Sequence, residues 1–291
     1  MIKEKQKISV IINTLNEEKN IEKCLKTVEW ANDVVIVDMH SDDATVEIAK
    51  KYTKNIYYFE RVGYSEPARQ FALDMTQNEW VLLVDADELI PKELSLILIK
   101  IASENRCDAV RMPRLNYLFG ELIKHAGYGP ENLQLRFFKK SKLSIRPRIH
   151  RFLVPADDAV IIDLSYKDIK TGIVHFESDC IASFLEKLNR YTSIEASQVG
   201  ELDENNKPLR KRRSKPYVLF IAAKTFFNKY ISRKGYLDGW RGFYLSMFAA
   251  FYKIAVYAKI EEYEGNGNVE SVHNKYDLTA QEIIRGYSDS E

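Results

Sequence analysis

The sequence predicts an α/β fold in which a mostly parallel sheet is flanked by helices and followed by a C-terminal helical extension. Short β-branched runs alternate with amphipathic helical segments through the first hundred residues. The connections between them are short, as in successive strand–helix units. Beyond about residue 200 the strand pattern stops and long, aromatic-rich helical segments follow. We therefore expect one α/β domain at residues 1–200 and a helical region at residues 201–291.

The first four expected strands are short and mainly β-branched. They fall at residues 8–12, 34–37, 56–59 and 80–84, separated by expected helices at 20–28, 45–52 and 66–75. The fourth strand, from Trp80 to Val84, contains no polar side chain between its aromatic start and its end. Such a run is typical of a strand that is buried on both faces of a parallel sheet.

Polar residues follow three of these strands, at 14–17, 38–43 and 85–87. Because the carboxyl ends of parallel strands meet at one sheet edge, where ligands bind in open α/β sheets, we expect these groups to converge. Residues two apart on an extended chain point the same way, so Asp85 and Asp87 should aim at one point. Their oxygens would suit Mg²⁺ or Mn²⁺ holding a diphosphate. The alternative is an acidic loop that caps the helix expected after Pro91.

Composition excludes several other classes of protein. The 43 basic and 42 acidic residues nearly balance, so total charge indicates no particular partner. The three cysteines are far apart and form neither a zinc-site spacing nor a disulfide framework, which favours a reducing compartment. The absence of a Gly-x-Gly-x-x-Gly or Walker loop argues against a dinucleotide enzyme or a P-loop NTPase. We expect no spanning helix, because no run of about twenty uninterrupted apolar residues occurs.

Four motifs, in this order, resemble family 2 glycosyltransferases of the GT-A fold. They are Ile-Ile-Asn-Thr-Leu-Asn-Glu-Glu (11–18), Val-Val-Ile-Val-Asp (34–38) with Ser41, Ala-Arg-Gln (68–70) with Ala72 and Leu73, and Val-Asp-Ala-Asp-Glu (84–88). Within that family the chain most resembles the bacterial group that includes lipopolysaccharide-core β-1,4-glucosyltransferases. The resemblance covers roughly the first 200 residues. It implies a nucleotide-sugar donor, usually a UDP-sugar, and inversion at the anomeric carbon.

The resemblance assigns the donor nucleotide to residues after the first two strands. Thr14, Asn16 and Glu17 would line the nucleoside pocket, together with Ser41. Asp38 would accept a hydrogen bond from the uracil ring. A helix cap for the following segment is the alternative role for Asp38.

The resemblance assigns the diphosphate to the later motifs. Arg69 would lie near it, and Asp85 and Asp87 would form the Asp-x-Asp pair that binds Mn²⁺ or Mg²⁺ and the ribose–diphosphate. The alternative for Arg69 is a surface charge on its helix. The sequence departs from the family at Asn13, where the family usually has Pro, and at Gln70, where it usually has Asn.

The segment from Lys124 to Phe138 resembles the group's acceptor loop. An inverting transfer needs a base for the acceptor hydroxyl, and Glu131 stands where the group usually has Asp. The alternative is that Glu131 caps a local turn. Gln134 and Arg136 are expected to face the cleft from a strand, and Arg136 would bind the donor phosphates or pair with an acidic residue.

Two histidines are candidates for a third metal ligand or an acceptor contact. His150 matches a histidine that recurs in the group, although the acidic residue that usually follows it is Arg151 here. His175 ends another expected strand. A structural role remains open for each histidine.

The C-terminal third combines basic and aromatic residues. A helix is expected at 181–199, then a basic run from Arg210 to Lys215, and apolar helices at 217–230 and 243–260. This combination suits attachment to an anionic membrane surface. Packing on the first domain and dimerisation are alternatives, whereas nucleic-acid binding is not expected because no such module accompanies the basic run. The last helix is expected to be too short to span a membrane, and the tail from Gly265 is expected to end in disorder.

Together with these observations, the resemblance implies a metal-dependent inverting glycosyltransferase that transfers a hexose to a cell-envelope glycan or glycolipid such as lipopolysaccharide core. It would be cytoplasmic and peripheral at the inner face of the cytoplasmic membrane. A nucleotidyltransferase is a second hypothesis, but it would carry a Gly-rich, basic loop where Asn13–Glu18 stands. A non-catalytic, membrane-associated binding protein on the same fold is a third hypothesis.

Overall fold

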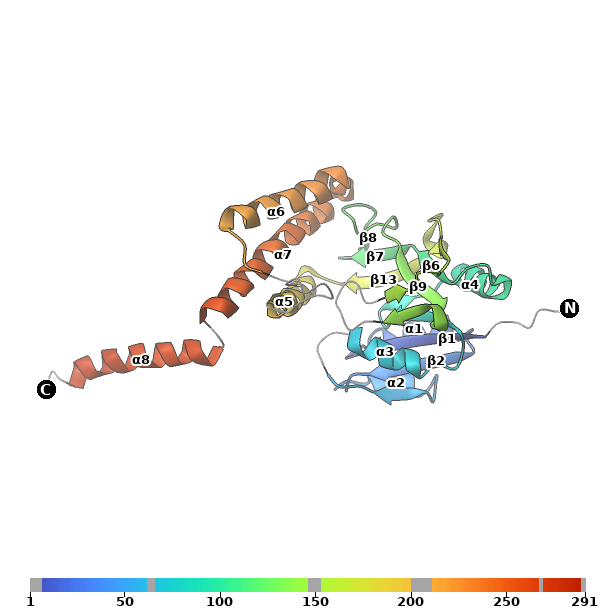
Figure 1. Ribbon diagram of the computed structural model, residues 1–291, viewed down its shortest axis with the longest axis horizontal. Coiled ribbons are helices and arrows are strands. Elements are labelled where there is room, and N and C mark those ends of the chain that lie inside the picture. The colour runs from blue at the N-terminus through green and yellow to red at the C-terminus, as the bar shows by residue number, and fades with distance from the viewer. Residues whose placement is uncertain (1–6, 62–65, 146–152, 200–210, 267–268, 289–291) are drawn as a thin grey trace. The chain divides into compact units, whose positions relative to one another are not determined.

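The computed structural model forms two compact units, Met1–Ser178 and Asp179–Glu291 (Figure 1). It describes residues 7–61, 66–145, 153–199, 211–266 and 269–288. The predicted boundary between residues 200 and 201 lies outside this described part. The compact units divide earlier, after Ser178, because helix α5 (Ile181–Ser197) packs with the later helix α7 (Gly239–Asn266).

The first unit is built on a seven-stranded sheet with the order β12-β6-β9-β4-β1-β2-β3. Its strands are β1 (Ile8–Thr14), β2 (Asp33–Asp38), β3 (Ile56–Tyr58), β4 (Trp80–Asp85), β6 (Ala109–Met112), β9 (Gln134–Lys139) and β12 (Ile161–Asp163). All are parallel except β9, which is antiparallel to both of its neighbours, β4 and β6. The predicted α/β fold with a mostly parallel sheet is confirmed.

Helices cover both faces of this sheet. On β1, Val10 and Ile12 pack in one apolar cluster with α1 (Ile21–Val28), α2 (Thr45–Ala49) and α4 (Lys92–Glu104). Ile11 points to the other face, where α3 (Glu66–Asp74) and the hairpin β10 (Leu143–Ile145) and β11 (Leu153–Pro155) pack. The period-two alternation of a strand therefore divides the core in two.

A second sheet of four short strands has the order β5-β13-β7-β8. Its strands are β5 (Glu88–Leu89), β13 (Ile173–Ser178), β7 (Arg114–Leu118) and β8 (Glu121–Leu122). Phe119 and Gly120 close the turn between β7 and β8 with φ angles of 55° and 83°. This sheet matters for function because His175 is paired in register with both Glu88 and Asn116.

The second unit is helical, as expected for the C-terminal extension. It contains α5, α6 (Lys215–Phe227), a π-helical turn (Asn228–Ser232), a 3₁₀ turn (Gly235–Asp238), α7 and α8 (Val269–Ser288). The tail from Gly265 was expected to end in disorder, but α8 occupies most of it, and its last three residues lie outside the described part of the chain. The segment lacks proline and carries Val272, Tyr276 and Ile283 at helical spacing, which outweighs its polar composition.

Helix α7 is longer than the expected 243–260. The segment Gly235–Gly265 is long and apolar enough, by length and composition alone, to cross a membrane. The expectation that this helix is too short to span is therefore wrong. Only 28% of its most apolar stretch is buried inside the protein.

Candidate active site

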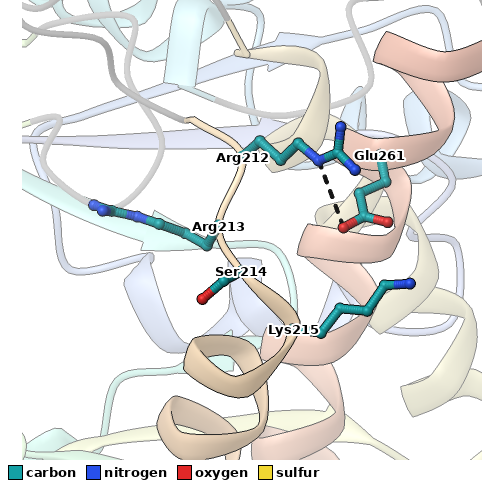
Figure 2. A pocket seen from close by; sticks show the side chains of 5 residues that line it. All are labelled: Arg212, Arg213, Ser214, Lys215 and Glu261. Atoms are coloured by element: carbon teal, nitrogen blue, oxygen red, sulfur yellow. Dashed lines mark ion pairs between the residues drawn. The ribbon is translucent and has the colours of Figure 1, made fainter.

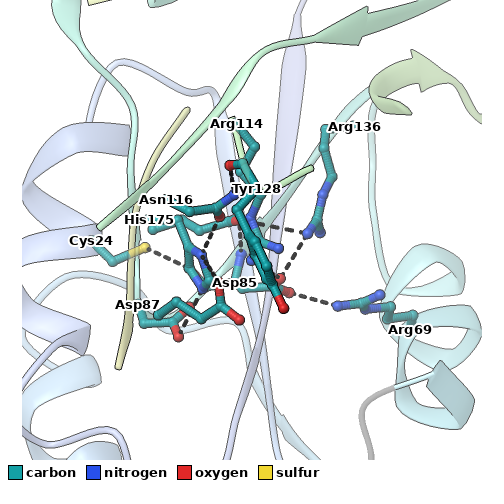
Figure 3. A network of polar contacts seen from close by, with 11 residues as sticks. Cys24, Arg69, Asp85, Asp87, Arg114, Asn116, Tyr128, Arg136 and His175 are labelled. Carbon is teal, nitrogen blue, oxygen red and sulfur yellow. Dashed lines mark hydrogen bonds and ion pairs between the residues drawn. The ribbon is translucent and has the colours of Figure 1, made fainter. Parts of the chain in front are cut away.

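The acidic residues after β4 lie on a turn. Strand β4 ends at Asp85, and the chain reverses through Ala86 and Asp87 before β5 begins. The fully buried Glu88 holds this turn, because its Oε2 accepts the backbone N–H of Asp85 at 2.8 Å. The expectation that Asp85 and Asp87 share one direction on an extended chain is therefore wrong, and the two carboxylates have different partners (Figure 3).

Three arginines from three elements surround the carboxylate of Asp85. Arg69 of α3 lies 2.6 Å from its Oδ1, while Arg136 of β9 and Arg114 of β7 lie 2.7 and 3.4 Å from its Oδ2. The same Arg114 and Arg136 also pair with Glu88, at 2.6 and 3.4 Å. The sheet edge thus gathers Arg69, Asp85 and Arg136, as the sequence predicted, and adds Arg114 and Glu88.

Charge pairing fixes the ionisation of this cluster. Burial alone would raise the pKa of Asp85, but the charges of Arg136, Arg69 and Arg114 outweigh it and hold the pKa well below its ordinary range. Burial would likewise lower the pKa of Arg136, yet Asp85 and Glu88 raise it. Asp85 is therefore an anion, and Arg136 a cation, over the whole range in which enzymes work.

Arg136 has bonding capacity left over. Its side chain is 5% exposed, and its Nη1 is buried without a hydrogen-bond partner among the described residues. A buried N–H without an acceptor is costly, so such a group normally meets a ligand or an ordered water. Arg136 therefore pairs with acidic residues and can still donate to an anionic ligand.

Asp87 faces a histidine of the second sheet. The Nε2 of His175 lies 3.3 Å from Asp87 Oδ2, and its Nδ1 lies 2.8 Å from the side-chain oxygen of Asn116. Because the amide nitrogen of Asn116 donates to the carbonyl of Tyr128 at 2.6 Å, its oxygen must face His175, so Nδ1 carries the proton. With the proton on Nδ1, Nε2 is an acceptor, and the Asp87 carboxylate is an acceptor too. Their contact therefore requires a proton or a metal ion between them.

The residues at this turn fit a divalent cation in chemistry, although no three His, Cys, Asp or Glu side chains are gathered as a ready metal site in the described part of the chain. Asp87 offers a carboxylate beside an oriented imidazole nitrogen, and Asp85 lies two residues before it. Oxygen and imidazole ligands suit Mn²⁺, and oxygen ligands suit Mg²⁺. The predicted ligand His150 lies outside the described residues.

The predicted nucleoside residues form a second network at the ends of β1 and β2. Asp38 is fully buried and accepts from Thr14 Oγ1 at 2.9 Å, Ser41 Oγ at 2.6 Å and Ser41 N at 2.8 Å. Ser41 Oγ in turn accepts the backbone N–H of the exposed Asn16 at 2.8 Å. Asp38 thus organises the loop that follows it and caps no helix, since α2 begins only at Thr45.

Glu17 belongs to the same loop. Its backbone N–H donates to Thr45 Oγ1 at 2.8 Å, and its carboxylate accepts from Asn20 at 2.9 Å. The half-buried Glu17 side chain is therefore anchored in the loop that also carries Asn16, and its contact with a nucleoside stays a prediction.

Two alternatives from the sequence, a surface charge for Arg69 and a helix cap for the acidic turn, can now be decided. Arg69 is 5% exposed, so it is not a surface charge on its helix. The acidic turn does not cap α4, because that helix begins after Pro91 without any side-chain cap.

Asn13 is the least expected member of the site. It is 7% exposed, lies beside Asp85 in the β1–β4 register, and both polar atoms of its amide lack hydrogen-bond partners among the described residues. The sequence had marked this position only as a departure from the family. Its unused donor and acceptor make it a candidate ligand contact.

Glu131 lies outside the network around Asp85. It is exposed on the loop before β9, makes no hydrogen bond or ion pair among the described residues, and its carboxylate lies over Gly129. The turn there is closed by the backbone instead, since the N–H of Asn132 donates to the carbonyl of Gly129 at 3.1 Å. The role of Glu131 as base stays a prediction.

Sequence reasoning missed several residues of this network. Arg114 and Asn116 lie two apart on β7, so their shared direction was readable from the sequence once that strand was placed. Tyr128 and Cys24 gave no such signal. Burial and the nearby Glu177 raise the pKa of the Tyr128 phenol, and burial, with the carboxylates of the turn, raises the pKa of the Cys24 thiol, so both stay protonated.

Comparison with known proteins places this geometry in context. Residues 9–156, about half of the chain, match the family model described as glycosyl transferase family 2. The lipopolysaccharide core biosynthesis glycosyltransferase LpsC of Rhizobium meliloti is 28% identical over 87% of this chain and 91% of its own length. An uncharacterized glycosyltransferase of Rickettsia bellii is 28% identical over 96% and 94%.

Solved structures are more distant. The mannosyltransferase PcManGT from Pyrobaculum calidifontis, in complex with GDP-Man and Mn²⁺, aligns with 88% of this chain and 87% of its own at 17% identity, with a TM-score of 0.49.

Proposed function

Because this chain belongs to glycosyl transferase family 2, we propose that it is an inverting hexosyltransferase that uses a nucleotide-sugar donor such as a UDP-sugar. The observation that carries the proposal is the joining, at the carboxyl ends of β1, β2 and β4, of an acidic turn with buried arginines. Parallel sheets of this kind bind ligands at that edge. The cluster supports both anion and cation binding.

Arg136 is the residue best suited to bind the donor diphosphate. The Nη1 of Arg136 is buried and lacks a partner among the described residues, while its Nη2 is held by Asp85 at 2.7 Å. Arginine N–H groups match phosphate oxygens in geometry and keep their charge at any working pH. As the sugar–phosphate bond breaks, negative charge grows on the diphosphate, and a donor already in place stabilises it.

A divalent ion would be held by Asp87, with Asp85 and the Nε2 of His175 beside it. When bound it would neutralise charge on the leaving diphosphate. The three carboxylates of the turn, at Asp85, Asp87 and Glu88, are balanced by three arginines. A cluster that is already neutral gains little from a cation alone, so the ion and the anionic donor should bind together.

Asn13 and the loop network supply the remaining donor contacts in this proposal. The unused amide of Asn13 lies beside Asp85 and would bond to the ribose or the phosphate. Asn16 and Ser41 line the nucleoside side, and the buried Asp38 keeps their loop in place. Asp38 has accepted three hydrogen bonds, and a carboxylate offers about four sites, which leaves room for one from a base ring.

Glu131 is the proposed base. Inversion needs the acceptor oxygen to attack the anomeric carbon from the side opposite the departing diphosphate. The hydroxyl proton passes to the Glu131 carboxylate as the new C–O bond forms and the old one breaks. Glu131 is exposed and has no partner among the described residues, so its carboxylate is free to meet an incoming hydroxyl.

The proposed acceptor is a cell-envelope glycan or glycolipid, such as lipopolysaccharide core. The similarity to LpsC over most of both chains supports this class. Such acceptors are built on lipid at the inner face of the cytoplasmic membrane, so we propose a cytoplasmic protein held peripherally at that face. The apolar, weakly buried α7 supports this location.

The test is release of nucleoside diphosphate from a panel of nucleotide sugars, with Mn²⁺ and a core-oligosaccharide acceptor. We expect acceptor-dependent release from one donor, and Glu131→Gln should reduce turnover by roughly 10²–10⁴-fold without weakening donor binding. Glu121→Gln, on the exposed end of β8, is the matched control. Full turnover of the Glu131 variant would move the base elsewhere, and no release from any donor would refute the proposed function.

A further inference from the structure

The exposed face of α7 is apolar along most of its length. Its large exposed side chains recur at intervals of three or four residues, so they form one stripe on the helix. They are 37–51% exposed: Trp240, Phe243, Tyr244, Met247, Phe251 and Ile254. The opposite face is also apolar, with Leu245, Val256 and Ile260 buried. A helix that only packs on a protein core would carry polar residues on its outer face.

Helix α6 carries a matching stripe. Tyr217, Phe220 and Phe227 of α6 are exposed at near-helical spacing, and Ile231 of the π-helical turn that follows α6 continues their stripe. Ring contacts hold α6 and α7 together at both ends, between Phe226 and Phe243 (6.0 Å) and between Tyr217 and Tyr257 (6.5 Å). We call the segment 211–260 the α6–α7 hairpin.

Helix α5 fixes the rotation of α7 about its axis. The ammonium group of Lys259 donates to Asn189, Thr192 and Ser193 of α5 at 2.7–2.8 Å, and Tyr252 donates to Glu195. These bonds turn the 252–260 face of α7 inward against α5. Specific polar contacts within the unit therefore fix the rotation of α7 about its axis and keep the stripe facing outward.

The charge of the hairpin is strongly one-sided. Residues 211–260 contain eleven lysines and arginines and a single acidic residue, Asp238, although the whole chain has a net charge of only +1. The remainder of the chain therefore carries the compensating negative charge. Among possible partners for an apolar surface, only an anionic one is favoured by so large a positive charge.

An open pocket at the start of α6 is lined mainly by cations. Its volume is about 310 Å³, and Figure 2 shows Arg212, Arg213 and Lys215 around it, with Ser214 and Glu261. Glu261 engages Arg212 at 3.7 Å, and Arg213 lies over the ring of Tyr217. The remaining positive charge stands beside the apolar stripe, as a phosphate next to an acyl chain requires.

We propose that the α6–α7 hairpin is the surface by which this protein docks on an anionic lipid bilayer. The stripes enter the boundary between head groups and acyl chains, and the cations at both ends bind lipid phosphates. This inference rests on the proposed function only in explaining why docking is useful, since a lipid-linked acceptor lies in the same membrane.

The hairpin lies along the bilayer and does not cross it. Lys224 stands in the α6 stripe one turn from both Phe220 and Phe227, and Arg233 and Lys234 lie at the connection between the helices. A hairpin that spanned the membrane would carry these charges through the apolar layer, which is costly for each of them. Interfacial binding leaves all three at the head groups.

The test is co-sedimentation of the full chain with phosphatidylcholine vesicles, with and without phosphatidylglycerol. We expect binding only with phosphatidylglycerol, and release at high salt. Phe220→Ser/Phe251→Ser should lower the bound fraction at least tenfold, as should Arg212→Gln/Arg213→Gln, whereas Leu96→Ser on α4, an equally exposed apolar residue, should not. Circular dichroism confirms folding of each variant. Equal binding to neutral vesicles, or none to anionic ones, would overturn the proposal.

Depth is measured separately by quenching of Trp240 with lipids brominated at different positions, with Trp240→Phe as the reference. Quenching by shallow bromines is expected, and stronger quenching by deep ones would show a spanning hairpin. Dimers that form without lipid and are lost in the stripe variants would assign the surface to a second copy. Donor binding is followed in the same preparations: its loss with vesicle binding intact would refute the proposed function alone.

Discussion

Asp85 is held in the folded protein by an arginine clamp, which we define as Arg69, Arg114 and Arg136 around its carboxylate. This is more positive charge than a residue that serves only a ligand requires. Three arginines meet its carboxylate, at 2.6, 2.7 and 3.4 Å. Replacing it with asparagine leaves those cations without their partner. We expect Asp85→Asn to lower the free energy of unfolding by about 3–5 kcal/mol. For a unit of this size the melting temperature would fall by roughly 6–20 °C, measured by calorimetry. An unchanged melting temperature would contradict the clamp.

The same clamp predicts an acid dependence. Because the pKa of Asp85 is lowered in the folded state, its contribution is fully present above the ordinary aspartate pKa of 3.8. It is lost as the pH falls below that value through the folded-state pKa. Unfolding midpoints of the wild type and Asp85→Asn should therefore converge in strong acid, and a gap that stays constant would count against the assignment.

Replacing Asn13 should affect the stability of the free protein and its affinity for the donor in opposite directions. Its buried amide has no partner among the described residues, so Asn13→Leu should leave the free protein as stable or more stable. The loss of one ligand hydrogen bond should weaken donor affinity by roughly 2–13-fold. Calorimetric unfolding and donor titration separate the two effects. A destabilised free protein would show that Asn13 is merely structural.

At this scale the sequence was informative about residue types and weak about partners. The motifs predicted that Arg69 and Asp85 share a site, and Arg69 lies 2.6 Å from Asp85. They did not predict that Asp87 would turn toward His175, because the extended alternation ends where Glu88 captures the Asp85 N–H. A single buried side chain redirected the chain there, and no local pattern encodes that.

Among elements, the strands of the first unit followed their hydrophobic pattern closely. β1 to β4 lie where β-branched runs predicted them, and for β1, β2 and β4 the reason is that a run buried on both faces has few alternatives. A strand was expected at Gln134 and Arg136, but the antiparallel pairing of β9 and the second sheet were not predictable, since pairing depends on contacts between residues distant in the chain. It is this second sheet that brings Arg114, Asn116 and His175 to the site.

The loop that carries Glu131 depends on a glycine at position 129. A Cβ on Gly129 would lie 2.1 Å from the carbonyl oxygen of Lys124 and 2.3 Å from Glu131 Oε2, so Gly129→Ala must displace the loop. We expect turnover to fall roughly 10²-fold through misplacement of the base, with donor affinity unchanged. Gly265→Ala, where a Cβ meets nothing within 4 Å, is the control. Normal turnover in the Gly129 variant would separate this loop from catalysis.

For the whole molecule, composition predicted two regions and concealed their difference in charge. The near balance of 43 basic and 42 acidic residues hides the excess of cations in residues 211–260. The stripe on α7 was equally hidden, since the sequence shows an apolar helix on all sides and only packing against α5 reveals which face stays exposed.

The two units should therefore separate in function. All of the described donor-site residues lie within Met1–Ser178. We expect a fragment of residues 1–178 to retain the stabilisation by nucleotide sugar with Mn²⁺, and to lose binding to anionic vesicles. Thermal shift and vesicle sedimentation measure the two properties. Vesicle binding by the fragment would place the lipid surface in the first unit instead.

The turn after β4 is proposed to bind a nucleotide sugar together with a divalent ion, and isothermal titration of the donor with and without Mn²⁺ measures this directly. Wild type should bind the donor at least tenfold more tightly with Mn²⁺. Asp87→Asn should abolish that difference while keeping its melting temperature, and Asp157→Asn, an exposed carboxylate of the first unit, should behave as wild type. Donor affinity that is the same with and without Mn²⁺, or a Mn²⁺ effect that survives in Asp87→Asn, would show that this turn does not bind the ion with the donor.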